Sequence, residues 1–345
     1  MNSKSVVLHN PFDLRIEDKD LPEPKGSQVL VKVRASGICG SDVNCYAGKT
    51  YEATFPYIPG HEWSGEVVEI GNSVTTVQKG DRVVGETVVG CGSCDKCKLG
   101  ANPNFCRRPT IYGFQTQSPG SFAKHVVRDE GNLHKLPPGM THDEGALVEP
   151  LSVAYHAIWK IAGGVQGCDQ VVIFGAGPIG LLVLATVKAA GARAISIDPI
   201  VKRRELAEKL GADEVIDPLR VDATEEVQRL TGGRGADLAV EASGTDDARS
   251  RLADVVDTSS RIVMIGQTVI KKIPFEMEKI IVKGLSIRGS AGSPNVFPQT
   301  IDLLSKKKSE ISSIVSHKYP FEKSKEAFDL ATQRNESVKI LILMD

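Results

Sequence analysis

Apolar and polar residues alternate in two different ways along this chain of 345 residues, and the change falls near residue 140. Before that point, short runs rich in valine and isoleucine are bounded by glycine, proline and asparagine, which is typical of strands joined by turns. These runs lie at 28–36, 63–71, 81–86 and 121–127, and a helical pattern follows at 141–163. The first part of the chain is therefore predicted to be a β domain.

From residue 170 onward, apolar strands and helices take turns at regular spacing. The strands are expected at 170–175, 192–198, 213–217, 236–244 and 261–266, and the helices between them at 178–191, 201–212, 223–233 and 247–257. This alternation predicts a parallel, doubly wound α/β sheet. We interpret the Pro/Gly-rich stretch at 289–298 as the crossing back to the first domain, before helices at 297–307 and 322–331 and a strand at 338–344.

Length and charge exclude several classes of protein. A chain of 345 residues favours two domains over one. The formal net charge is −1 and acids and bases are mixed, which indicates neither a nucleic-acid surface nor a membrane-binding face. No apolar run approaches the length of a transmembrane helix, and the first residues lack the apolar core of a signal peptide. We therefore expect a cytoplasmic protein.

Four of the seven cysteines lie in one stretch, CGSCDKCKLGANPNFC, at residues 91–106. Disulfides, a redox pair and a metal site are all compatible with such crowding, but a reducing compartment favours zinc. Thiolates separated by two residues can turn toward one centre, and four of them complete a tetrahedron with no open position. We predict a structural zinc ion, in a lobe at about 88–110, bound by Cys91, Cys94, Cys97 and Cys106.

A glycine-rich turn, VVIFGAGPIG, follows the first strand of the α/β region and opens a helix. The G-x-G-x-x-G spacing in this context is typical of dinucleotide sites, because the glycines let backbone and helix N-terminus approach the pyrophosphate. Asp198 ends the next strand, where its carboxylate suits the ribose hydroxyls and repels a 2′-phosphate. Arg203 and Arg204 favour NADP, yet the balance favours NAD. The predicted cofactor contacts are Gly175, Gly177, Pro178, Ile179, Gly180, Asp198 and Arg203.

A second candidate metal site is divided between two short stretches, GICGSD at 37–42 and PGHEWSGEVVEIG at 59–71. Cysteine, histidine and carboxylate side chains all bind zinc, and three protein ligands leave a fourth position for water or substrate. The spacing does not bring these stretches together, so they share a metal only if the fold joins them.

These stretches carry a resemblance to a known family. The pattern G-H-E-x2-G-x5-G-x2-V at residues 60–74, the run CGSD and the four-cysteine lobe resemble the zinc-dependent medium-chain alcohol dehydrogenases, most of all the polyol (sorbitol), sugar-alcohol and L-threonine branch. The likeness extends over essentially the whole chain. It implies a GroES-like β-barrel catalytic domain at 1–150 and 290–345, a Rossmann NAD-binding domain at 151–289, and an active site in the cleft between them.

The resemblance also assigns roles to individual residues. Cys39, His61 and Glu62 would bind a catalytic zinc ion, with Glu149 reaching it directly or through its water, which makes two zinc ions per chain. Asp42 would hydrogen-bond the ligating histidine. Ser41 would contact the substrate alcohol and begin removal of its proton. The family's proton relay often ends in a histidine where this chain has Asn44.

The implied reaction is hydride transfer from a secondary alcohol to NAD, with zinc polarising the substrate oxygen. Polyols, sugar alcohols, sugar acids and cyclitols are the leading small-molecule substrates, and L-threonine and small diols are the alternative. The Arg–Tyr pair of polyol dehydrogenases has no counterpart in GSAGS at 289–293, which argues against open-chain sorbitol-like substrates. A non-catalytic NAD-binding regulator is the alternative from another class. A homodimer or homotetramer is expected.

Overall fold

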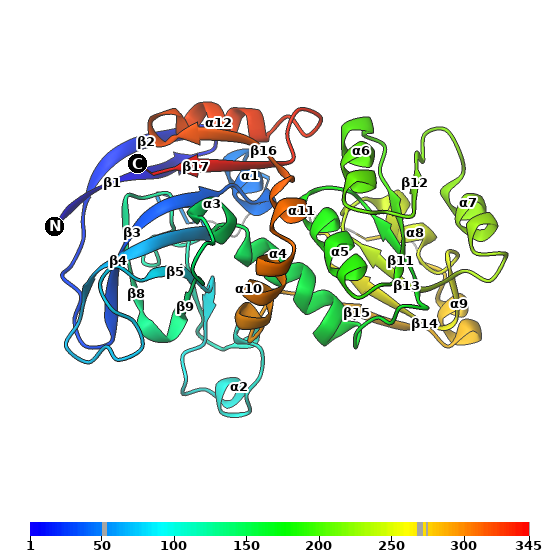
Figure 1. Ribbon diagram of the computed structural model, residues 1–345, viewed down its shortest axis with the longest axis horizontal. Helices are drawn as coiled ribbons and strands as arrows, with labels where there is room; N and C mark the ends of the chain where they lie inside the picture. The colour runs from blue at the N-terminus through cyan, green and yellow to red at the C-terminus, as the bar shows by residue number, and fades with distance from the viewer. Residues whose placement is uncertain (50–53, 268–271, 274, 345) are drawn as a thin grey trace. The chain divides into compact units, whose positions relative to one another are not determined.

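The computed structural model describes residues 1–49, 54–267, 272–273 and 275–344, and its contacts divide the chain into two units (Figure 1). Unit 1 contains Met1–Glu149, Phe297–Lys306 and Val315–Asp345. Unit 2 contains Pro150–Val296 and Lys307–Ile314. Among the described residues, no helix has the length and apolar character needed to cross a bilayer.

The centre of unit 1 is a seven-stranded, mostly antiparallel sheet. Its strands follow the order β16-β17-β3-β4-β5-β9, and β8 also pairs with β3. Val29, Val31 and Val33 alternate along β3 and supply part of the core together with Val67 of β4, because successive side chains of a strand point to opposite faces. The strand bounds are Gln28–Gly37 (β3), Glu62–Ile70 (β4), Arg82–Gly85 (β5), His125–Asp129 (β8), Leu133–Lys135 (β9), Val315–Pro320 (β16) and Lys339–Leu343 (β17).

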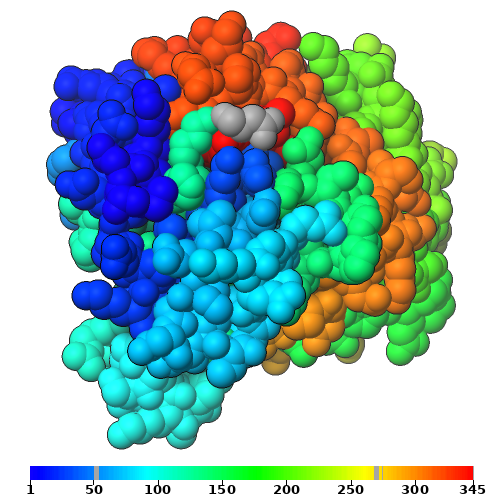
Figure 2. Space-filling model, turned by 60° about the vertical axis from the view of Figure 1, so that its left-hand side comes forward, coloured from blue at the N-terminus to red at the C-terminus, as the bar shows by residue number. Residues whose placement is uncertain are grey.

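Shorter elements complete unit 1. A hairpin of β1 and β2 stands beside the large sheet, and a small lobe projects from the body of the unit (Figure 2). The lobe contains β6, β7, α2 and a 3-10 turn. The bounds are Asn2–Asn10 (β1), Asp13–Asp20 (β2), Gly40–Tyr46 (α1), Val88–Val89 (β6), Asp95–Lys98 (α2), Pro103–Phe105 (3-10), Thr110–Ile111 (β7), Glu130–Asn132 (3-10), His142–Gly145 (α3), Phe297–Lys306 (α10), Phe321–Lys323 (3-10) and Ser324–Ala331 (α12).

Unit 2 is built on a six-stranded sheet in which every pairing is parallel, in the order β12-β11-β10-β13-β14-β15. This order reverses direction beside β10, and ligands of such sheets bind at the carboxyl ends of the strands at that switch point. The strands are Gln170–Phe174 (β10), Arg193–Ile197 (β11), Glu214–Ile216 (β12), Ala236–Glu241 (β13), Val256–Met264 (β14) and Ser286–Gly289 (β15).

The helices of unit 2 cover both faces of this sheet, with α5 and α6 on one side and α7, α8 and α9 on the other (Figure 1). The doubly wound sheet and the separate β domain that the sequence predicts are thus confirmed. The bounds are Val148–His156 (α4), Ala157–Ile161 (a π-helical turn), Pro178–Ala189 (α5), Val201–Lys209 (α6), Ala223–Leu230 (α7), Asp246–Arg251 (α8), Met277–Lys283 (α9) and Lys308–Ser312 (α11).

Two predicted helices differ from the observed elements. The helix expected over 141–163 is divided into α3, α4 and the π-helical turn. The helix expected over 247–257 is wrong at its end, because α8 stops at Arg251 and β14 begins at Val256. Val256 is fully buried and pairs with Ala236 of β13, so sheet pairing rather than helical periodicity decides its conformation.

Candidate functional site

Cys39, His61 and Glu62 form a group that could hold a metal ion in unit 1, since one ligand atom from each lies within 4.8 Å of the others. The strand register explains how they meet. Gly37, at the end of β3, pairs with Glu62 at the start of β4, so the residues just beyond these two strand ends face one another. His61 and Glu62 are buried and Cys39 is partly exposed, which leaves the group open to a ligand on the cysteine side.

Asp42 joins the two ligand stretches from one side. Its carboxylate accepts hydrogen bonds from the Cys39 amide at 3.0 Å and the Gly60 amide at 3.3 Å, and lies 3.7 Å from His61 Nδ1. Burial raises the pKa of Asp42 against the influence of His61. Burial opposes a charged His61 ring, but the neighbouring Asp42 and Cys39 outweigh it and raise the histidine pKa. The predicted hydrogen bond from His61 to Asp42 is wrong, because 3.7 Å is too long and the buried Nδ1 has no hydrogen-bond partner among the described residues, so the carboxylate acts on the ring only as a nearby negative charge.

Lys339 joins the same stretches from the other side and was not identified by any motif. Its ammonium donates to both Glu62 carboxylate oxygens, at 2.6 and 2.8 Å, and to the carbonyl of Ile38 at 3.1 Å. Burial lowers the lysine pKa, but the charges of Glu62 and Cys39 outweigh it and raise the value. The signal available in the sequence is a lysine inside the apolar run VKILILM, because buried lysines need a partner.

Glu149 lies near this group without joining it. Among the described residues, it is not one of those whose ligand atoms fall within 4.8 Å of one another. Thr87 Oγ1 donates to its Oε1 at 3.0 Å. Burial raises the pKa of Glu149 to about 7, although the nearby charge of His61 acts in the opposite direction. Its carboxyl group can therefore change protonation state near neutral pH.

A loop at 112–122 covers the histidine. The ring of Phe114 packs against the ring of His61, with centroids 5.1 Å apart and planes at 31°. Gly113 allows this approach, because a Cβ atom there would collide with the carbonyl of Gly60. Gly60 itself has a φ of +99°, a region that favours glycine. The G-H-E motif thus needs its glycine for backbone geometry, and its histidine is held between Asp42 and Phe114.

Ser41 and Asn44 lie in α1, which begins directly after Cys39. Both side chains are partly exposed. Ser41 is therefore carried close to the ligand group by the same helix that places Asp42, while no described contact distinguishes Asn44.

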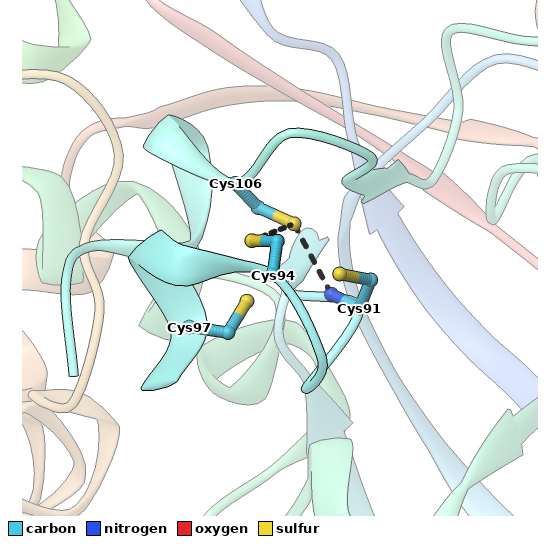
Figure 3. Close-up of side chains that lie close together, drawn as sticks. All are labelled: Cys91, Cys94, Cys97 and Cys106. Carbon is cyan, nitrogen blue, oxygen red and sulfur yellow. Dashed lines mark hydrogen bonds between the residues drawn. The ribbon is translucent and has the colours of Figure 1, made fainter. Parts of the chain in front are cut away.

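The four lobe cysteines also meet, with their sulfur atoms within 4.8 Å of one another (Figure 3). The sulfurs of Cys94 and Cys106 are 3.8 Å apart, too far for a disulfide bond. The amides of Cys91 and Arg108 donate to Cys106 Sγ at 3.2 and 3.3 Å. A hydrogen bond from Ser93 lowers the pKa of Cys91 to about 5, which favours the thiolate form that metals bind. This donor set fits a closed zinc site.

The glycine turn of unit 2 has the form that a dinucleotide requires. Gly175 has a φ of +95°, and a Cβ atom there would lie 2.9 Å from atoms of Ser243. A Cβ atom at Gly180 would collide with the carbonyl of Gly175. Gly177 is the N-cap of the twelve-residue α5 and Pro178 its first residue, so the helix start has no capping side chain. The turn therefore presents backbone at the switch point of the sheet.

Asp198 and Arg203 lie beside this turn. Both oxygens of the buried Asp198 carboxylate accept backbone hydrogen bonds, from Ala176 at 2.7 Å and Ile200 at 2.8 Å. Arg203 Nη1 lies 3.8 Å from Asp198 Oδ2 and close to Gly177. The acid thus fixes the glycine turn, and the arginine places a positive charge where phosphate groups would lie.

A buried carboxylate, Glu241, ties together the carboxyl ends of β13 and β14, and none of the sequence motifs includes it. Its side chain accepts hydrogen bonds from the amides of Ser243 at 2.8 Å and Gly244 at 2.7 Å. Arg249 contacts it at 3.4 Å and also donates to the carbonyl of Gly266 at 2.7 Å. The segment that packs against the glycine turn is therefore held by one ionic network.

Two serines of the stretch at 289–293 form side-chain contacts with α4. Ser290 Oγ lies 3.3 Å from Nδ1 of His156, and Ser293 accepts a hydrogen bond from Ser152 at 2.6 Å. Burial lowers the pKa of His156, so its ring is neutral at neutral pH. Serines here join α4 to the end of β15, where polyol dehydrogenases are expected to have an arginine and a tyrosine.

Comparison with known proteins gives the family. The family model for the alcohol dehydrogenase GroES-like domain matches residues 25–138, and that for zinc-binding dehydrogenases matches residues 178–306. The chain is 36% identical to a sorbitol dehydrogenase of Halalkalibacterium halodurans over 99% of both chains. It is 36% identical to an L-threonine 3-dehydrogenase of Pyrococcus horikoshii over 96% of each.

A solved structure also matches this chain over nearly its whole length. An alcohol dehydrogenase from Escherichia coli CFT073, complexed with NADH, matches with a TM-score of 0.90 and 28% identity over 99% of both chains. The resemblance seen in the sequence motifs is confirmed by these findings, and sorbitol and L-threonine dehydrogenases are both among the relatives. Across nearly its whole length, this chain belongs to the zinc-binding medium-chain alcohol dehydrogenase family, in its polyol and threonine branch.

Proposed function

We propose that this protein oxidises a secondary alcohol to a ketone and transfers the hydride to NAD. The observation that carries the proposal is the group of Cys39, His61 and Glu62, with Asp42 hydrogen-bonded behind it, in a chain that also has the glycine turn of a dinucleotide site. Polyols, sugar alcohols, sugar acids and cyclitols are the proposed substrates. These molecules share a secondary hydroxyl group flanked by further polar groups.

Cys39, His61 and Glu62 would hold the catalytic zinc ion, with Glu149 beside them, while the four lobe cysteines would hold a structural one. When bound, the catalytic ion supplies Lewis-acid polarisation of the substrate oxygen. Asp42 would place a negative charge beside the His61 ring, which raises the ring's basicity as a ligand. Ser41, in the first turn of α1, would take the proton of the substrate hydroxyl while passing its own proton on toward Glu149 or water. Glu149 is the nearby carboxyl group that can exchange a proton in place of the absent relay histidine at Asn44.

Gly175, Gly177 and Gly180, with Pro178 and Ile179, would hold the pyrophosphate against the start of α5. Asp198 would accept hydrogen bonds from ribose hydroxyls in addition to its backbone partners, and its negative charge disfavours a 2′-phosphate. Arg203 would neutralise phosphate oxygens. We therefore propose NAD as the preferred cofactor over NADP.

L-Threonine is the second candidate substrate, supported by the relative of that name at 36% identity. The serine-rich stretch at 289–293 also supports a substrate other than open-chain sorbitol, since the serines are already paired with α4. The two classes differ in charge, because L-threonine carries an ammonium and a carboxylate.

A direct experiment is NADH formation by the zinc-loaded protein with alditols, cyclitols, aldonates and L-threonine, beside a Cys39→Ser variant. We expect turnover with one substrate class and its loss in the variant. If the protein binds zinc and NAD but oxidises none of these substrates, or if the variant is as active, the proposal fails and a non-catalytic NAD-binding role becomes the better interpretation.

We also propose that two copies associate through unit 2. All four residues of β15, the edge strand, are exposed, and α9 beside it exposes Ile281 and Val282. An unpaired edge next to apolar side chains is suited to pair with a second copy. Sedimentation analysis should give a dimer or tetramer that Val282→Asp weakens, and a monomer for the unmodified protein would contradict this.

A further inference from the structure

One ammonium group connects the two stretches that carry the metal-binding residues of unit 1. Lys339, on β17, donates to the carbonyl of Ile38, next to Cys39, and to both oxygens of Glu62, next to His61. The lysine is 2% exposed and the glutamate 1%, so the pair has almost no contact with water. Gly37 makes room for this arrangement, because a Cβ atom there would collide with Glu62 Oε2.

The charges around this pair are unbalanced. Cys39, Asp42 and Glu62 can each carry a negative charge, and Asp42 and Glu62 are fully buried. Over the described ranges of the chain, Lys339 is the one lysine or arginine that forms an ion pair with any of these three. Buried charges are costly unless they are paired, and His61 faces Asp42, so without a metal Glu62 depends on Lys339 for its counter-charge.

We propose that Lys339 is a positioning residue that acts as a resident counter-charge for Glu62 and keeps the metal-binding group assembled while it holds no metal. This inference rests on the proposed function, because it takes Cys39, His61 and Glu62 as the catalytic metal ligands. The lysine fixes the glutamate and the turn before Cys39 at once. A metal ion then meets ligands already in place, and little ordering remains to be done on binding.

The charge balance makes this role testable. A bound zinc ion brings two positive charges to the cluster, so the loaded protein depends less on the lysine than the metal-free protein does. Removing the lysine charge should therefore destabilise the metal-free protein more than the loaded one. If Lys339 only filled space, its replacement would reduce the stability of the metal-free and the loaded protein by the same amount.

The experiment is thermal unfolding of the full-length protein, chelator-treated and zinc-loaded, for the unmodified chain and for Lys339→Met. We expect the variant to lower the melting temperature of the metal-free form by about 5–10 °C more than that of the loaded form. Lys339→Arg should restore most of this difference. Lys318→Met is the matched control, since Lys318 lies on the adjacent β16, is half-exposed and pairs with Asp143; it should change both forms alike.

A Cys39→Ser variant separates this inference from the proposed function, because zinc can then stabilise the protein only through the lobe. If zinc raises the melting temperature of the unmodified protein no more than that of Cys39→Ser, the metal site itself is wrong and both proposals fall. The other outcome is that zinc stabilises the unmodified protein more than it stabilises Cys39→Ser, which supports the metal site. In that case the inference about Lys339 alone is overturned if Lys339→Met lowers the melting temperatures of both forms equally, leaves both unchanged or prevents both from folding.

Discussion

The two groups of unit 1 that could hold a metal are built in opposite ways. The four lobe cysteines come from sixteen consecutive residues, of which only Cys106 is buried, and Cys106 Sγ accepts hydrogen bonds from the amides of Cys91 and Arg108 in or beside the same stretch. The other group is buried and needs Cys39, His61, Glu62 and Lys339, which the fold brings together from three distant parts of the chain. A site whose ligands are close together in the sequence can be closed and unreactive. In a site assembled by the tertiary fold, neighbouring buried charges can change the properties of the ligands.

The loss of one ligand from the buried group should have the largest effect on catalysis. Cys39→Ser removes a thiolate from the metal and should lower turnover by about a thousandfold or more, since metal polarisation is worth several kcal/mol. The zinc content should fall from two ions to one per chain. A variant that keeps both ions, or that keeps most of its turnover, would contradict the difference drawn between the two groups.

Asp42→Asn should have the next largest effect. The amide keeps the shape but loses the negative charge that faces His61 Nδ1, and the loss of such a partner costs about 10–100-fold in metal affinity or activity. The measurement is the zinc dissociation constant by competition with a chromogenic chelator, together with kcat. Unchanged affinity would mean that the buried group does not depend on its charged surroundings.

A matched pair of glycine substitutions compares the rigidity of the two groups. A Cβ atom at Gly37 would collide with Glu62, which Lys339 holds in place, while a Cβ atom at Gly90 would lie 2.9 Å from the partly exposed Cys97 sulfur. Gly37→Ala should cost about 1–3 kcal/mol of stability through overpacking, and Gly90→Ala about 0.5 kcal/mol. Chemical denaturation of both variants measures these losses. Equal losses of unfolding free energy would mean that the two groups do not differ in rigidity.

Disrupting the lobe should have the smallest effect on catalysis. Cys97→Ser should release the lobe's zinc ion and speed proteolysis within residues 91–106 by at least about tenfold, because local unfolding exposes the chain. At 25 °C, kcat should remain close to that of the unmodified protein. A large fall in kcat, with the second zinc ion still bound, would show that the lobe does more than hold its own shape.

The sequence predicted features whose residues are close together in the chain. The strand–turn–helix around Gly175 and the cysteines at 91–106 follow from local spacing, and the structure has both. Cys39 and His61 required the family resemblance, because only the register of β3 and β4 joins them. Lys339 could not be found by spacing, since its partner Glu62 lies 277 positions away.

The failures in secondary structure have the same origin. Val256 follows an apolar pattern that continues the helix before it, but its pairing with β13 makes it a strand residue. The role of Glu241 likewise depends on Arg249 and on the end of β14, and nothing in its own segment indicates it. Local periodicity identifies elements, while buried charges are explained only by what the tertiary fold places beside them.

Anomalous diffraction at the zinc edge from crystals of the zinc-loaded protein would locate both metal ions. We expect two peaks per chain, one among the four lobe sulfurs and one among Cys39 Sγ, the His61 ring and a Glu62 carboxylate oxygen. A single peak in the lobe, at a zinc concentration that supports turnover, would contradict the assignment of the buried group as the reactive metal site.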